Sequence, residues 1–195
     1  MFTQFRNTEI ILASNSPRRR ELLELTDLPF KTFVIPDLDE DFPTLEEAEL
    51  VAKWLAKSKM KAYKTLWSEP NKIVITADTI VVVDDLILNK SSTKEEAMEM
   101  IKSLSGKSHK VITGVGIKSA EREAYFDDTT IVEFKKLTDS QIEYYVDKYK
   151  PFDKAGSYGI QEWIGLVGIR KIDGSYFNVM GLPVDLVIEE LMKFH

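Results

Sequence analysis

The chain has 195 residues, of which 44% are hydrophobic and 30% charged, as in an ordinary globular protein. It carries 26 Lys and Arg against 32 Asp and Glu, and this net charge of −6 argues against a nucleic-acid-binding surface. With no cysteine and only two histidines, disulfides, thiolate zinc sites and a Cys nucleophile are excluded. Any metal is therefore expected on carboxylates, which favours Mg2+ or Mn2+.

The first residues show no basic segment followed by an apolar run of signal-peptide length. No apolar run approaches the roughly 18 residues that cross a membrane. We therefore expect a cytoplasmic protein with no membrane partner. The length fits one domain over residues 1–195, or one domain with two lobes.

The chain begins with a short apolar strand over residues 9–13. A turn follows at 14–16, and a helix is expected from Pro17, since proline suits the first position of a helix. A second strand is predicted over 30–35 and a long helix over 45–66, with apolar residues at helical spacing.

The most apolar run, residues 73–85, is rich in β-branched side chains and predicts a buried central strand. Capping-box spacing then marks two helix starts, at Thr93 and Thr138. The other elements expected are paired strands over 111–117 and 123–134, a strand over 166–172 and a closing helix over 184–192. Strand and helix patterns that interleave in this way predict an α/β fold.

The turn after the first strand is a candidate phosphate site. The helix start offers free backbone N–H groups, and Arg18, Arg19 and Arg20 add bidentate donors. Cations oppose the dipole at this end of a helix, so their presence hints at function. The alternative is a solvated basic turn that pairs with the acidic loop at 37–41.

Asp78 is a second candidate, because a carboxylate in an apolar strand is costly unless it is paired or binds a cation. With Thr79 beside it, it predicts a strand-borne carboxylate facing a cleft; the alternative is a bulge or two short strands. Asp39, Glu40 and Asp41 could supply further metal ligands, or simply form a solvated loop.

A third candidate is the glycine-containing stretch 153–161. Its glycines let the backbone come close to a ligand, and the amide of Gln161 could read a base edge, although a plain turn is as compatible with the pattern. Lys59 and Lys90, taken alone, fit surface charge equally well.

Taken together, these segments resemble the Maf family of nucleotide pyrophosphatases. The resemblance is carried by ILASNSPRRRELL (11–23), LAKSKMKA (55–62), ADTIV (77–81), LNK (88–90), EEAMEMIKSLSGKSHKVITGV (95–115), DKAGSYGIQ (153–161) and IDGSYFNVMGLP (172–183). It implies an α/β fold of the Maf/ITPase type, with two lobes of mixed sheet and helices around an elongated substrate cleft, and a homodimer. It also implies hydrolysis of a nucleoside triphosphate to the monophosphate and pyrophosphate with a divalent metal.

Carried over by position, the resemblance implies phosphate contacts from Ser14, Arg18, Arg19, Lys59 and Lys90. It implies that Asp78 accepts a proton and binds the metal, with Glu40 supporting the metal or the water.

One branch of the family hydrolyses dTTP and UTP, and its specificity positions here are Arg19, Thr79 and Gln161. A second branch prefers 7-methyl-GTP and carries Trp in the arginine motif and Glu in place of Gln161. The sequence sides with the first branch. The family's links to septum formation leave a nucleotide-sensing regulator as the alternative function.

The sequence departs from the family pattern in two places. Ser91 follows Lys90 where proline is usual, and this change is expected to loosen the loop. Glu162 and Trp163 follow Gln161 where glycine is usual, and a carboxylate and a large ring beside the expected base pocket could alter specificity.

Overall fold

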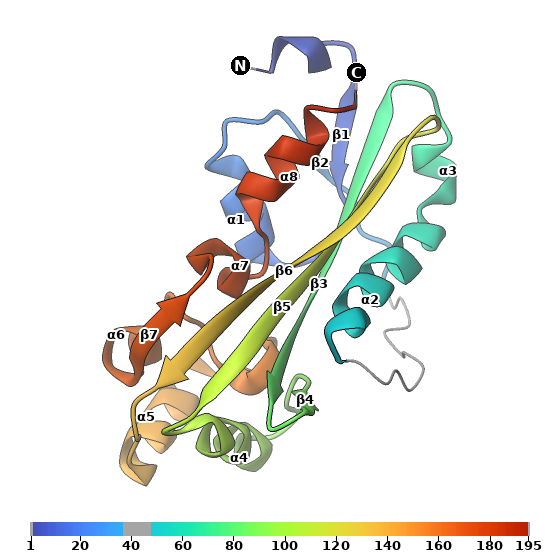
Figure 1. Cartoon of the computed structure of the whole chain (residues 1–195). Helices are drawn as coiled ribbons and strands as arrows, with labels where there is room; N and C mark the ends of the chain where they lie inside the picture. The colour runs from blue at the N-terminus through green and yellow to red at the C-terminus, as the bar shows by residue number, and fades with distance from the viewer. Residues whose placement is uncertain (1, 37–47, 195) are drawn as a thin grey trace. The chain divides into compact units, whose positions relative to one another are not determined.

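The computed structural model describes residues 2–36 and 48–194 (Figure 1). The predicted metal ligand Glu40, with Asp39 and Asp41, lies outside the described residues. The chain divides into two compact units. Unit 1 comprises Met1–Asp78, Thr113–Asp128 and Gly181–His195, and unit 2 comprises Thr79–Ile112 and Thr129–Met180.

Helices and strands interleave along the chain. The helices are η1 (Thr3–Phe5), α1 (Pro17–Glu24), α2 (Ala48–Ala62), α3 (Lys64–Trp67), α4 (Lys94–Leu104), α5 (Asp139–Tyr149), η2 (Ala155–Ser157), α6 (Trp163–Gly168), α7 (Tyr176–Met180) and α8 (Val184–Leu191). The strands are β1 (Glu9–Leu12), β2 (Lys31–Thr32), β3 (Lys72–Val83), β4 (Leu86–Leu88), β5 (Ser108–Lys118), β6 (Glu123–Phe134) and β7 (Ile169–Asp173).

Within the described residues the strands form a mixed sheet in the order β2-β1-β3-β5-β6-β7, with β4 paired to β3. β1 runs parallel to both β2 and β3, whereas β4 is antiparallel to β3 and β7 is antiparallel to β6. β3, β5 and β6 each contribute residues to both units. The predicted α/β class, the central strand β3 and the pairing of β5 with β6 are confirmed.

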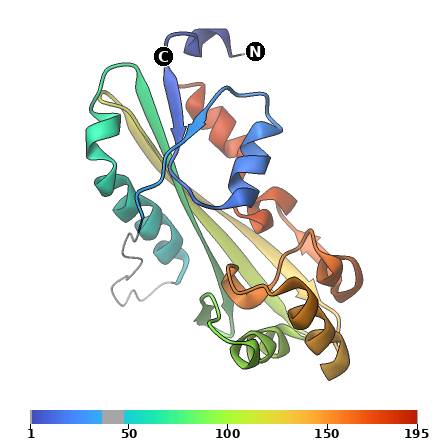
Figure 2. The same ribbon diagram turned by 180° about the vertical axis from the view of Figure 1, so that it is seen from behind.

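In unit 1, α2 and α3 lie on one side of β1 and β3, and α1 and α8 lie on the other (Figures 1 and 2). The side chains of Ile11 and Val74 pack with Met60 of α2 and with Tyr63, which lies between α2 and α3. Because side chains alternate along a strand, the neighbours of Ile11 on β1 face the other way, where Leu22 and other apolar residues are buried.

In unit 2, the core gathers around Phe134 of β6, where α4 and α5 cover the ends of β3, β5 and β6. Both helix starts were predicted from capping residues. Thr138 forms a full capping box with Gln141, and the hydroxyl of Thr93 accepts a hydrogen bond from the N–H of Glu96.

Three predicted boundaries are wrong. The helix predicted over 45–66 ends at Ala62, because Tyr63 leaves helical geometry (φ −93, ψ 21) before α3 begins. The predicted strand over 30–35 is reduced to β2. The strand predicted from 166 begins at Ile169, because the apolar run before it forms α6, in which Leu166 is 81% exposed.

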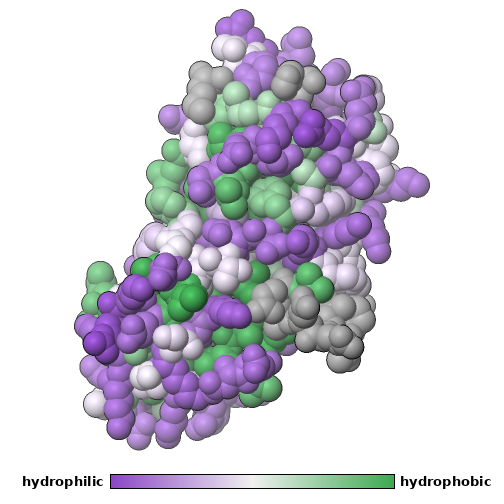
Figure 3. Space-filling model, in the orientation of Figure 1, coloured by the Kyte–Doolittle hydropathy of each residue, from purple (hydrophilic) through white to green (hydrophobic). Residues whose placement is uncertain are grey.

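Hydrophilic side chains cover most of the face seen in Figure 3, and hydrophobic side chains appear between them in smaller patches. Among the described residues, none of the helices has the length and apolar character needed to cross a membrane.

Candidate active site

Asp78 pairs directly with Lys59 in unit 1. Nζ of Lys59 on α2 lies 2.5 Å from Oδ2 of Asp78 on β3, and the two side chains are 13% and 14% exposed. Asp78 therefore sits within an uninterrupted strand with a cationic partner, which offsets the cost of placing a carboxylate among apolar residues. β3 runs without a break from Lys72 to Val83, so the alternative of two short strands does not hold.

Small residues bring α2 close enough to the sheet for this pair to form. A Cβ at Gly114 of β5 would lie 2.3 Å from the carbonyl carbon and oxygen of Ala52, so only glycine admits the helix backbone there. One turn further, the hydroxyl of Thr76 donates to the carbonyl oxygen of Ala56 at 2.8 Å. Lys59 follows on the next turn, beside Asp78.

The arginine turn after β1 is held together by hydroxyl groups. Ser16 caps α1 by accepting the N–H of Arg19 at 3.4 Å, and Pro17 occupies the first helical position as predicted. The hydroxyl of Ser14 accepts from the N–H of Ser16 at 3.2 Å and from Nη1 of Arg19 at 3.4 Å. Arg18 lies on the first turn of α1 and is partly buried.

The guanidinium group of Arg19 ties this turn to two other parts of unit 1. Nη1 donates to the carbonyl oxygen of Ala77 at 2.9 Å, and Nε donates to that of Gly181 at 2.8 Å. Ala77 directly precedes Asp78 in β3. The structure therefore brings Ser14 and Arg19 to the strand segment that carries Asp78.

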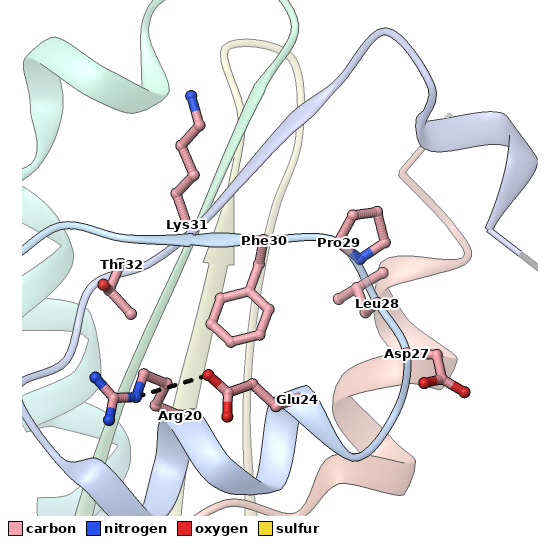
Figure 4. A pocket seen from close by; sticks show the side chains of 8 residues that line it. All are labelled: Arg20, Glu24, Asp27, Leu28, Pro29, Phe30, Lys31 and Thr32. Carbon is pink, nitrogen blue, oxygen red and sulfur yellow. Dashed lines mark ion pairs between the residues drawn. The ribbon is translucent and has the colours of Figure 1, made fainter.

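A surface hollow of about 650 Å3 lies on another part of unit 1 (Figure 4). It is lined by Arg20, Glu24, Asp27, Leu28, Pro29, Phe30, Lys31 and Thr32. Arg20 and Glu24 form an exposed ion pair at 3.7 Å in its wall. Of the three arginines in the candidate phosphate turn, only Arg20 lines this hollow, and none of the residues to which the family resemblance assigns a role does.

In unit 2, Lys90 is exposed and the residues on both sides of it are anchored. The carbonyl oxygen of Asn89 accepts from the N–H of Gly156 at 3.2 Å. Ser91 is 4% exposed and its hydroxyl accepts from that of Ser157 at 2.8 Å. Ser91 therefore ties the loop to the stretch 153–161 rather than loosening it, and a proline side chain could not make that bond.

Comparison with known proteins shows the family of the chain. Residues 9–194 match the family described as Maf-like protein. The chain belongs to the Maf-like family. The resemblance drawn from the sequence motifs is thereby confirmed over nearly the whole chain.

Curated relatives cover the chain along its length. A protein of Porphyromonas gingivalis named dTTP/UTP pyrophosphatase is 44% identical over 195 residues, covering 100% of this chain and 98% of its own. One of Parabacteroides distasonis with the same name is 46% identical over 194 residues, covering 100% of both chains. The solved structure of the Staphylococcus aureus Ham1 protein overlaps with a TM-score of 0.48 at 18% identity, over 96% of this chain and 100% of that one.

Among the described residues of this Maf-like chain, Asp78 is the carboxylate that the sequence assigns to a metal. The described residues contain no group of three or more His, Asp and Glu side chains able to hold an ion. Asp78 supplies one carboxylate. Because Mg2+ is often bound by one or two carboxylates together with substrate phosphates, this single carboxylate fits such a site.

Several contacts of this Maf-like site could not be found by motif. The backbone acceptors for Arg19 lie at Ala77 and Gly181, and carbonyl groups leave no mark on the sequence. In unit 2, Tyr145 and Glu162 bond to each other beside the turn that carries Gln161. The departure from the family pattern at Glu162 and Trp163 was the signal in the sequence that this turn differs.

Proposed function

We propose that this Maf-like protein hydrolyses dTTP and UTP to the nucleoside monophosphate and pyrophosphate. The observation that carries the proposal is the Lys59–Asp78 pair, largely enclosed and next to the Ala77 carbonyl that Arg19 holds. The names of relatives that share about 45% of their residues over the full chain support the same reaction.

In the proposed mechanism, Asp78 accepts a proton from the water that attacks the α-phosphorus. The new bond joins the water oxygen to the α-phosphorus, and the bond from that phosphorus to the α–β bridging oxygen breaks. Pyrophosphate leaves with the electron pair. Lys59 lies within contact of the carboxylate, so its ammonium group is placed to stabilise negative charge that builds up beside Asp78.

The phosphate contacts are proposed from Ser14, Arg18, Arg19, Lys59 and Lys90. Guanidinium groups bind phosphate oxygens in bidentate fashion, and lysines add point charges. The bonds of Arg19 to Ala77 and Gly181 support a fixed orientation for its guanidinium group, so that little conformational entropy is lost when substrate binds.

A divalent cation, Mg2+ or Mn2+, is part of the proposal, with Asp78 and Glu40 as its protein ligands. When bound, such an ion neutralises phosphate charge and lowers the pKa of a coordinated water.

Base selection is assigned to Arg19, Thr79 and Gln161. Of the three, Gln161 fits this role best, because it is exposed whereas the residue before it, Ile160, is only 5% exposed. Its amide offers both a donor and an acceptor, as the edge of a pyrimidine base requires. A homodimer in the cytoplasm completes the proposal, and light scattering on the purified protein tests the dimer.

One assay tests the function. The protein is incubated with Mg2+ or Mn2+ and a panel of nucleotides that includes dTTP, UTP, the other triphosphates and 7-methyl-GTP. We expect dTTP and UTP to be the best substrates and pyrophosphate to be the product. A preference for 7-methyl-GTP would place the chain in the second branch of the family. The absence of turnover on every nucleotide would favour a nucleotide-sensing role.

A further inference from the structure

A chain of hydrogen-bonded side chains lies buried beside Gln161, all of it within unit 2. Tyr145 of α5 is 0% exposed, and its hydroxyl donates to Oε2 of Glu162. The same hydroxyl accepts the backbone N–H of Gly159 at 2.9 Å. Burial raises the pKa of Tyr145, and so does the neighbouring carboxylate, so the hydroxyl keeps its proton and remains a donor.

The other oxygen of the Glu162 carboxylate faces a lysine. Nζ of Lys154 lies 3.3 Å from Oε1 of Glu162 and 2.8 Å from Oδ1 of Asp153. The side chains of Lys154 and Glu162 are only 9% and 17% exposed. Removing one partner of a pair so enclosed leaves a poorly solvated charge, so the arrangement resists rearrangement.

Glycine at position 159 allows Glu162 to reach this place. A Cβ there would lie 2.8 Å from Cδ of Glu162 and 3.1 Å from Cε of Lys154. The N–H of Glu162 also donates to the carbonyl oxygen of Gly159 at 3.0 Å. Both ends of the turn 159–162 are therefore fixed, and Gln161 is its exposed residue.

We propose that Tyr145, Glu162 and Lys154 are positioning residues that fix the direction of Gln161 and so set how strongly the enzyme selects a pyrimidine base. The inference rests on the proposed function, in which Gln161 reads the base. The three side chains act through the backbone of the turn rather than by touching substrate. A glycine at position 162 could make neither the bond to Tyr145 nor the ion pair with Lys154.

The test uses Tyr145→Phe, which removes one hydroxyl, and Glu162→Gln, which removes one charge. Tyr144→Phe is the matched control, because Tyr144 is the preceding residue of α5, is 43% exposed and bonds Lys148 instead. Values of kcat and KM are measured separately for dTTP, dGTP and 2-deoxyribose 5-triphosphate, which has no base. Thermal melting confirms that each variant is folded.

We expect Tyr145→Phe and Glu162→Gln to lower the dTTP-to-dGTP ratio of kcat/KM about tenfold, mainly through the KM for dTTP. Turnover of the base-free triphosphate stays within about twofold of the wild type, since it makes no contact with Gln161. Tyr144→Phe leaves the ratio unchanged. If Tyr145→Phe does not fold, Glu162→Gln provides the deciding variant, because it keeps the shape of the side chain.

An unchanged ratio in the folded variants overturns the inference. So does an equal loss on all three substrates, because a merely structural role would not spare the base-free compound. The wild-type arm separates the two proposals: a wild type that cleaves no nucleotide contradicts the proposed function itself, whereas an active wild type with unaltered variants contradicts only the positioning role.

Discussion

Nζ of Lys59 lies 2.5 Å from Oδ2 of Asp78, and the pair joins the helix α2 to the middle of the strand β3. A second lysine of α2, Lys53, makes a pair of the same length with Oδ1 of Asp127 on β6. The two pairs differ in exposure, with side chains 13% and 14% exposed in the first and 38% and 27% in the second. The second pair is therefore a natural control for the first.

The first prediction concerns the proposed base. Asp78→Asn should lower kcat on dTTP at least a hundredfold, because an amide cannot accept the proton of the attacking water. Asp127→Asn, which breaks the control pair, should leave kcat within about twofold of the wild type. Steady-state kinetics on folded protein checks both. An Asp78→Asn enzyme with near wild-type turnover would remove Asp78 from the role.

The second prediction concerns the lysine of the same pair. Lys59→Met should reduce kcat/KM for dTTP by about tenfold to a hundredfold, since it removes a cation placed beside Asp78 and the phosphates. Lys53→Met, on the same helix, should have little effect on kcat/KM. The pair of Lys53 with Asp127 has no role in the proposed mechanism, and partly exposed ion pairs contribute little to stability. Equal losses in the two variants would point to a general effect of charge on α2.

The third prediction concerns close packing at Gly114. Alanine at this position must displace the backbone of Ala52, and overpacking of this kind costs about 1–3 kcal/mol in the free energy of unfolding. Because the displaced helix carries Lys59, kcat/KM for dTTP should fall as well. Urea denaturation and kinetics on the same preparation measure both effects. A Gly114→Ala protein with wild-type stability and activity would show that α2 is not held at this contact.

The fourth prediction concerns acid stability. His109 is buried, its Nε2 lies 2.7 Å from the hydroxyl of Tyr158, and burial lowers its pKa from the usual 6.5 to about 4. Between these values the unfolded chain binds a proton that the folded protein does not. The stabilisation is therefore complete above pH 6.5 and is lost as the pH falls toward 4, by about 3 kcal/mol in total.

Urea denaturation at a series of pH values measures this loss, and the His109→Gln variant is the comparison. The amide keeps a polar group near Tyr158 but does not titrate, so its free energy of unfolding should fall less steeply between pH 6.5 and 4. Parallel curves for wild type and variant would assign the acid sensitivity to other groups.

The fifth prediction concerns the residue assigned to base reading. Gln161→Glu should weaken selection of dTTP and UTP over other triphosphates, because a carboxylate cannot donate a hydrogen bond to the base. The ratio of kcat/KM for dTTP to that for dGTP is the measurement. An unaltered substrate profile would take Gln161 out of the base-reading role.

Local chemistry in the sequence was enough to predict much of the fold. Pro17 marked the start of α1, Thr138 and Gln141 marked the start of α5, and the β-branched run around Asp78 marked β3. These signals lie within a few residues of the structure that they specify. The same reasoning failed around Leu166, which is largely exposed. It predicted a strand there, whereas the residues up to Gly168 form the helix α6.

The partners within the site could not be predicted, because they depend on contacts distant in sequence. Arg19 bonds the carbonyl oxygen of Gly181, and no side-chain pattern reports such a contact. Glu162 was expected to alter the base pocket directly, but its carboxylate turns inward to Tyr145 and Lys154. Motifs gave the candidate residues, and packing decides which of them meet.

The central claim is that water attacks the α-phosphorus of dTTP or UTP with Asp78 as proton acceptor. Hydrolysis of dTTP in 18O-labelled water, followed by mass spectrometry of the products, tests it most directly. The account predicts one labelled oxygen in the nucleoside monophosphate, unlabelled pyrophosphate and loss of the reaction in Asp78→Asn but not in Asp127→Asn. Label in the pyrophosphate, or orthophosphate as the first product, would contradict it.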